Sequence, residues 1–245
     1  MTREQIAGGT LVVEGYPARH LAGPLRVRPG ELIMVVDNGA LEHAVEVVSV
    51  ERERVTGSVL WSRPASGEPR LRLEVVQGLV REIDDVIAGL VEVGAAAIHP
   101  VAALRSVSRP GPERSASRLR HWREIAREAA QLAHRAVIPA VHPARDLPGA
   151  LNALPRGARI LACMVDAAVP LARLAVDPAR PAALMIGPEG GFAPTEVDRL
   201  RQAGAEMVHL GARVLPARRA GVVAAGLLLA RAGDLDAAMP GAERR

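Results

Sequence analysis

Two glycine-bearing turns have the residue types and spacing to bind a ligand. The first is Leu184-Met185-Ile186-Gly187-Pro188-Glu189-Gly190-Gly191-Phe192, where an apolar strand ends in a glycine-rich turn and a helix follows from about Pro194. Glycine lets the backbone approach a ligand closely and adopt positive φ angles. Because parallel sheets bind ligands at the carboxyl ends of their strands, this turn is a candidate site. An ordinary strand-to-helix turn is an equal alternative on glycine content alone.

The second turn repeats that topology about 24 residues later. His209-Leu210-Gly211-Ala212-Arg213-Val214-Leu215-Pro216 leaves a strand through a glycine and enters the last helix. Neither turn has the spacing of a dinucleotide-binding G-x-G-x-x-G motif or of a P-loop. Their apolar flanks suit an adenosine and a thioether better than a polyphosphate, and the two turns could line one pocket.

The composition excludes several classes of protein. All 31 basic residues are arginine, so neither a Schiff-base lysine nor a P-loop lysine can exist. The single cysteine, Cys163, excludes an intrachain disulfide and a cysteine-cluster metal site, which fits a reducing cytosol. The longest apolar stretch, 220–230, is shorter than the roughly 20 residues that cross a bilayer. We therefore expect a soluble, cytoplasmic protein with no membrane partner and no metal.

Positive charge is concentrated in one part of the chain. Residues 1–68 hold seven arginines and nine acidic residues, a net charge of −2. Residues 105–145 hold nine arginines and three acidic residues, a net charge of +6. A basic belt of this size indicates a polyanionic partner such as RNA, although a solvated helix face is the alternative. With so few aromatic residues, base stacking would depend on Trp122, Phe192 or exposed arginine planes.

The chain divides into a β-rich part and an α/β part. Four short runs rich in β-branched residues, 9–14, 31–36, 43–48 and 55–60, are separated by turn signals and predict a small antiparallel barrel over 1–68, with 62–69 as a linker. Strands and helices alternate over 69–245, which predicts a parallel sheet with helices on its faces. We expect strands at 71–76, 96–98, 158–165, 182–186 and 206–210, and helices at 79–93, 116–135, 168–175, 194–203 and 217–231. The segment 105–116 is interpreted as a mobile loop.

The two turns and several other motifs resemble the RsmE family, whose members methylate uridine N3 in 16S ribosomal RNA. Ile186-Gly187-Pro188-Glu189-Gly190-Gly191-Phe192 is followed by a helix, a strand and Leu210-Gly211-x-Arg213-Val214-Leu215, as in that family. Arg19-His20-Leu21, Glu92-Val93-Gly94 and Glu128-Ala129-Ala130 with Arg135 resemble further family motifs. The resemblance covers essentially the whole chain, and its motifs occur in the same order.

The resemblance implies a PUA-like β-barrel followed by a SPOUT methyltransferase domain with a C-terminal trefoil knot, a rare exception to unknotted topology. It implies a homodimer that uses S-adenosylmethionine and acts on 16S rRNA or the small ribosomal subunit. The residues implied to bind the cofactor, largely through backbone groups, are Met185, Ile186, Gly187, Glu189, Gly190, Gly191, Leu210, Gly211, Val214, Leu215 and Ala220. The region after the strand at 158–163 is a further candidate.

Catalysis requires removal of the uridine N3 proton, or cationic groups that stabilise the N3 anion beside the methyl group. Arg135 and Arg213 match family positions and, with Arg218, are the candidates for this role. The candidates for RNA contact are Arg26, Arg105, Arg118 and Arg219. A helix-face arginine and a salt-bridge partner are the alternative interpretations of Arg135 and Arg213.

Several polar positions depart from the family pattern. Arg218 and Arg219 stand where a carboxylate and a hydroxyl are usual, and Ala193 replaces a helix-capping serine. Leu132 and Gly89 replace polar residues, and a lysine expected near Leu79 is absent. Three functions therefore stay open: an active rRNA methyltransferase, a catalytically impaired paralogue that binds RNA or modifies a different RNA, and a dimer that binds a small molecule.

Overall fold

The computed structural model describes residues 5–39, 41–65, 67–106 and 112–236. Contacts between Cα atoms group these residues into two units. The first unit contains the residues up to 68 together with 134–137, and the second contains 69–133 and the residues from 138 onward. Each unit has its own hydrophobic core.

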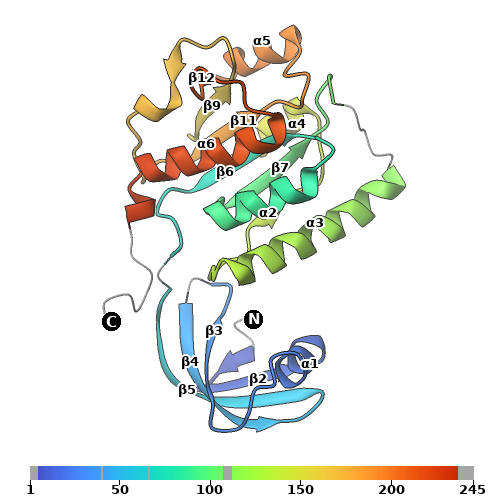
Figure 1. The fold of residues 1–245 in the computed structure, drawn as a ribbon, viewed down its shortest axis with the longest axis vertical. Helices are drawn as coiled ribbons and strands as arrows, with labels where there is room; N and C mark the ends of the chain where they lie inside the picture. The colour runs from blue at the N-terminus through green and yellow to red at the C-terminus, as the bar shows by residue number, and fades with distance from the viewer. Residues whose placement is uncertain (1–4, 40, 66, 107–111, 237–245) are drawn as a thin grey trace. The chain divides into compact units, whose positions relative to one another are not determined.

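The first unit is a five-stranded antiparallel sheet with one short helix (Figure 1). Its strands, in the spatial order β1-β2-β5-β4-β3, are β1 (Ile6–Ala7), β2 (Thr10–Glu14), β5 (Arg54–Pro64), β4 (Leu41–Val50) and β3 (Leu32–Val36). Alternate residues point inward, so that Val45 and Val47 are buried while Glu46 and Val48 are exposed. The four strands predicted from the sequence are confirmed.

Helix α1 (Tyr16–Ala22) in this unit was not predicted. It has only seven residues, too few for apolar periodicity to be visible, and it lies between Gly15 and Gly23. Pro17 occupies its first turn, where the missing N–H costs no hydrogen bond.

The second unit is built on a seven-stranded sheet in which every pairing is parallel. The strands, in spatial order, are β10 (Val169–Pro170), β12 (Glu206–His209), β9 (Arg159–Cys163), β11 (Ala182–Ile186), β6 (Leu73–Gly78), β7 (Ala97–Val101) and β8 (Ala140–Val141). The predicted parallel α/β architecture is thereby confirmed.

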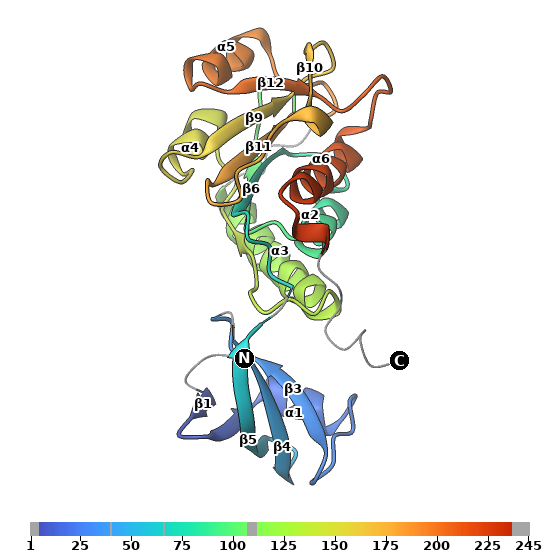
Figure 2. The same ribbon diagram turned by 90° about the vertical axis from the view of Figure 1, so that its left-hand side faces the viewer.

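Helices cover both faces of this sheet (Figure 2). On one face lie α2 (Ile83–Val93), α3 (Pro112–Leu132) and α6 (Ala217–Arg231), packed on a core that includes Leu73 and Val75. On the other face lie α4 (Leu147–Asn152) and α5 (Pro194–Gln202), packed on a core that includes Val76 and Met185. No helix among the described residues is long and apolar enough to span a membrane.

Several details of the sequence prediction are wrong. Helix α3 begins at Pro112, within the segment 105–116 that was interpreted as a mobile loop. Residues 168–175 form β10 and a 3-10 turn rather than a helix, because a proline at 170 disfavours the helical conformation of the preceding Val169. The helix predicted from 79 begins at Ile83. Helix α3 ends at Leu132, and the positive φ of His134 (53°) prevents it from reaching 135. Helix α4, which begins after Asp146, was not predicted; the Asp146 side chain accepts from Gly149 N.

Candidate active site

The fold brings the two glycine-bearing turns to the same edge of the sheet. Strands β11 and β12, which lead into the turns, are separated only by β9, a distance of about 10 Å for two strand spacings. After β12 the chain enters α6, which contacts β11 and β6. The segment 210–216 therefore links the carboxyl end of β12 to a helix that packs on β11 and β6 (Figures 1 and 2). This arrangement is the one that a shared ligand site requires.

The turn at 187–191 is tightly folded on itself. A Cβ atom on Gly187 would lie 3.1 Å from backbone atoms of Gly191 and Phe192, so a larger residue would push the turn open. Gly191 has a φ angle of 65° and donates its N–H to Pro188 O at 2.8 Å. Gly187 is needed because a side chain would not fit, and Gly191 is needed because its φ angle is positive.

Three neighbouring segments hold this turn from outside. Strand β6 ends against it, because a Cβ atom on Gly78 would lie 2.4 Å from Pro188 N. The N–H of Arg81 donates to Glu189 Oε1 at 3.4 Å. Arg105 donates from Nη1 to the carbonyl oxygen of Gly190 at 3.1 Å. Arg105 was predicted to contact RNA; the structure shows that it also braces the turn.

Glu196 supports the helix that follows the first turn, and the sequence analysis missed it. Its carboxylate is buried, and Oε2 accepts the N–H of Ala193 at 2.8 Å while Oε1 accepts the N–H of Leu104 at 2.9 Å. It thus satisfies the start of α5 although Ala193 has no side-chain cap, and it ties the loop after β7 to the helix that follows the turn. A glutamate three residues after the N-cap is half of a capping box, a signal that could have found it.

The turn at 210–216 has fewer supports. Gly211 has a φ angle of 105° and donates its N–H to His209 Nδ1 at 3.0 Å. Val214 is 73% exposed. Leu210 and Ala220, by contrast, are partly buried against the core. Leu215 is also partly buried.

Arginines surround this second turn. Arg213 and Arg219 are exposed. Arg218 lies 3.8 Å from Glu82, measured between Nη1 and Oε1, and Glu82 is the N-cap residue of α2. Of the predicted catalytic residues, Arg213 lies within the turn and Arg218 two residues after it, and both are exposed.

Met185 and Ile186 are placed differently from the other residues predicted to bind the cofactor. Both are buried, with Met185 in the core on one face of the sheet and Ile186 in the core on the other. Only their backbone groups could contact a ligand at the end of β11. Glu189 and Gly190 are exposed.

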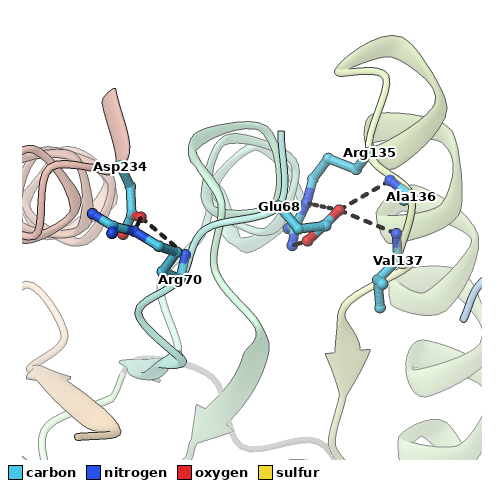
Figure 3. A network of polar contacts seen from close by, with 6 residues as sticks. All are labelled: Glu68, Arg70, Arg135, Ala136, Val137 and Asp234. Carbon is cyan, nitrogen blue, oxygen red and sulfur yellow. Dashed lines mark hydrogen bonds and ion pairs between the residues drawn. The ribbon is translucent and has the colours of Figure 1, made fainter. Parts of the chain in front are cut away.

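Arg135 lies in the first unit rather than with the two turns. It is buried and its Nη2 donates to Glu68 Oε2 at 2.7 Å, while Oε1 of Glu68 accepts the N–H groups of Ala136 and Val137 (Figure 3). A catalytic role would require this ion pair to open. In the second unit, Asp234 similarly accepts from Arg70 N at 2.9 Å (Figure 3).

The two aromatic side chains expected to stack on RNA bases are buried, whereas one in the first unit is exposed. Trp122 and Phe192 are 1% and 5% exposed and cannot stack on a base. Arg118, predicted to bind RNA, lies over the ring of Trp122 at 5.5 Å.

Trp61 on β5 is 42% exposed, and the guanidinium of Arg63 lies 4.7 Å from its ring centre. Arg26, exposed and with a φ angle of 51°, belongs to the same unit as Trp61.

Two surface hollows are defined in the second unit. One of about 330 Å³ lies beside the first turn and is lined in part by Arg105, Met164 and Phe192. The other, of about 300 Å³, lies at the start of strands β9 and β11, beside Arg159 and Ala182. Residues of 210–216 line neither of these two hollows.

The titratable groups with altered pKa values lie along the strands rather than in the turns. Burial alone would raise the pKa of Glu74, but hydrogen bonds from His99 (2.8 Å) and Arg72 (2.8 Å) hold this pKa below its ordinary value. Burial, followed by the charge of His99, lowers the pKa of His142, whose ring stacks on that of His99. Burial raises the pKa of the Cys163 thiol to about 12, which keeps it protonated at neutral pH.

Comparison with known proteins decides the family. Residues 67–229 match the RNA methyltransferase domain family. The chain is 34% identical over 228 residues to ribosomal RNA small subunit methyltransferase E of Mycobacterium bovis, covering 89% of this chain and 86% of that protein. This chain belongs to the RsmE family. The RsmE protein of Bacillus subtilis is 25% identical over 228 residues, covering 88% of each chain. The crystal structure of Neisseria gonorrhoeae RsmE bound to S-adenosyl methionine is 29% identical, covers 91% of this chain and 90% of its own, and has a TM-score of 0.78.

Proposed function

We propose that this RsmE family member transfers the methyl group of S-adenosylmethionine to N3 of a uridine in small-subunit ribosomal RNA in the cytoplasm. The observation that carries the proposal is that the turns 187–191 and 210–216 follow the carboxyl ends of two parallel strands, β11 and β12, which only β9 separates. That edge is where sheets of this kind bind their ligands. The gonococcal relative, whose structure contains S-adenosyl methionine, supports the choice of cofactor.

The residues of the two turns fit this cofactor. A Cβ atom on Gly191 or Gly211 would meet no atom within 4 Å, so the backbone at both positions borders open space that a ligand can fill. The backbone groups of 187–191 and 210–215 would hold the cofactor, with the partly buried side chains of Leu210 and Leu215 nearby. When bound, S-adenosylmethionine supplies an electrophilic methyl group on a sulfonium.

The chain itself must make uridine N3 nucleophilic. The N3 proton has to leave before the methyl group is accepted, and nearby positive charge favours the resulting anion. Arg213, Arg218 and Arg219 supply that charge at the second turn. No acidic residue lies within 210–220, so we assign electrostatic stabilisation to these arginines and release of the proton to solvent.

Each unit has residues suited to RNA binding. Within the belt, Arg120 and Arg123 are exposed on α3. In the first unit, the exposed Trp61 with Arg63 over its ring is a surface on which a base can stack. Because residues 1–68 carry a net charge of −2, we expect this unit to contribute stacking more than phosphate binding.

We further propose that the protein is a homodimer. Val165, Val169 and Val214 are 76%, 44% and 73% exposed and lie in the segments that follow β9 and β12 or pair with β12. Exposed apolar side chains grouped near one edge of a sheet favour a protein partner. Sedimentation of the protein tests this, and a Val214→Glu variant should sediment as a monomer. A wild-type monomer at micromolar concentration would contradict it.

A second candidate function is RNA binding without methyl transfer. It is favoured by Arg218, which stands at a usual carboxylate position and pairs with Glu82. Such a protein would bind RNA with a log–log salt slope of about −0.7 per phosphate contacted and show no turnover. The third possibility, a small-molecule-binding dimer, would bind RNA weakly and without salt dependence.

One assay separates these functions. The protein is incubated with small-subunit RNA and S-adenosylmethionine labelled on the methyl group, and the nucleosides are analysed after digestion. Label in 3-methyluridine is the expected result. Label in another nucleoside would contradict the assigned position, and RNA binding without label would favour the second candidate.

A further inference from the structure

The end of strand β6 contacts both elements of the proposed ligand site. Gln77 is fully buried and pairs in register with Ile186, the residue before the first turn. The next residue, Gly78, comes so close to the first turn that a Cβ atom would lie 2.4 Å from Pro188 N and 2.7 Å from Gly187 C. This close approach fixes the position of the first turn on the sheet.

The side-chain amide of Gln77 is held in one orientation but is only partly satisfied. Its Nε2 donates to the carbonyl oxygen of Gly78 at 3.0 Å. A flipped amide would set two oxygens against each other, so the assignment of nitrogen and oxygen is fixed by this bond. The other atom, Oε1, is buried and has no hydrogen-bond partner among the described residues. Burial of an unpaired acceptor is unfavourable, so packing alone does not explain a glutamine here.

The unpaired oxygen points at the first turns of helix α6. A Cβ atom on Gly221 would lie 2.6 Å from Gln77 Oε1 and 3.7 Å from Ile186 Cγ1. One Cα hydrogen of Gly221 therefore faces the oxygen, and any other residue at this position would displace either the Gln77 amide or the helix. Gly221 lies five residues after Pro216, where the second turn ends.

We propose that Gln77 is a positioning residue for methyl transfer, which sets the distance between the two turns through its contact with Gly221. Gly78 places the first turn, and Gln77 places the start of α6 and hence the segment 210–216 that leads into it. Gln77 touches neither turn directly and takes no part in the chemistry. The role rests on the proposed function, since it concerns the geometry of the same site.

The test combines three variants with a matched control on the same helix. Gly221→Ala should lower the affinity for S-adenosylhomocysteine at least tenfold in calorimetry while circular dichroism shows a folded protein. Gly226→Ala is the control, because a Cβ there meets Val93 Cγ2 at an ordinary 3.4 Å and should leave affinity unchanged. Gln77→Ala combined with Gly221→Ala should recover most of the lost affinity, because the smaller side chain makes room for the added methyl. Gln77→Leu should raise KM for the cofactor more than it lowers kcat.

A second readout needs no ligand. Amide hydrogen exchange of 210–216 should be faster in Gly221→Ala than in the wild type, and should return toward the wild-type rate in the double variant. Wild-type affinity and exchange in Gly221→Ala, or a double variant no better than the single one, would overturn the positioning role. If the wild type binds no S-adenosylhomocysteine, the proposed function fails, and the exchange rates still decide whether Gln77 positions the segment.

Discussion

The two turns of the candidate site differ in how they are supported. The turn at 187–191 is backed by Gly78, by the N–H of Arg81 and by the guanidinium of Arg105, and a formed hollow lies beside it. The turn at 210–216 has one hydrogen bond to His209 and an exposed Val214. A rigid first turn would act as a preformed anchor, while the second turn would gain most of its contacts from ligand and partner. Preorganisation of one side lowers the ordering cost of binding.

The largest effect on methyl transfer is expected at the turn 187–191. In Gly190→Val the Cβ alone would come within 3.1 Å of Arg105 Cβ, and the branched side chain would push the turn outward. Since a displacement of about 1 Å can cost roughly 100-fold in rate, we expect methyl transfer to fall by about that factor or more. Methyl transfer to small-subunit RNA measures this. Ala203→Val, at the exposed end of α5, is the control and should retain activity.

The contacts that hold the neighbourhood of the turn 187–191 should contribute to the free energy of unfolding. Glu196→Ala leaves the N–H groups of Ala193 and Leu104 without their carboxylate, at a cost of about 1–3 kcal/mol in the free energy of unfolding. Urea unfolding measures the change. Glu128→Ala, at an exposed position on α3, should change it by less than about 0.5 kcal/mol. Equal effects of the two substitutions would contradict the role given to Glu196.

Stability of the sheet should depend on pH independently of both turns. The pKa of His142 is lowered from an ordinary 6.5 in the folded protein, so the unfolded chain takes up its proton first as pH falls. The free energy of unfolding should therefore decrease as pH falls below about 6.5, and His142→Phe should flatten this slope while keeping a ring to stack on His99. The pKa of Glu74 is also lowered, so its contribution is present above its ordinary 4.5 and is lost below it. An unchanged slope in His142→Phe would assign the pH dependence to other groups.

The smallest effect on the free energy of unfolding is expected at the turn 210–216. Val214→Ser should change the free energy of unfolding by less than about 0.5 kcal/mol, because the side chain is 73% exposed. It should nevertheless weaken dimerisation or methyl transfer, which sedimentation and the methyl transfer assay measure. A loss of stability as large as that of Glu196→Ala would remove the distinction between the two turns.

The sequence predicted the parallel sheet and the existence of both turns because these depend on local signals. Apolar strands, glycines at strand ends and the amphipathic helix α2 are visible in the order of residues. Helix α6 over 217–231 was predicted correctly, since its long run of small and apolar residues is bounded by Pro216. The same reasoning failed at 168–175, where Val169 precedes a proline and is extended in β10 despite the apolar pattern.

The contacts behind the turns could not be predicted, because they join residues far apart in the chain. Arg105 reaches Gly190 across 85 residues, and Gln77 meets Gly221 across a longer stretch. Arg135, a catalytic candidate from its motif, pairs with Glu68 across 67 residues. Residue type and spacing do not reveal such long-range pairings.

The central claim is that 187–191 and 210–216 form one site for the methyl donor. Amide hydrogen exchange with and without S-adenosylhomocysteine tests it most directly. We expect both segments to gain protection on binding, with the larger gain in 210–216 because it starts with fewer contacts. Protection confined to one segment, or appearing at the hollow beside Arg159 instead, would contradict the account.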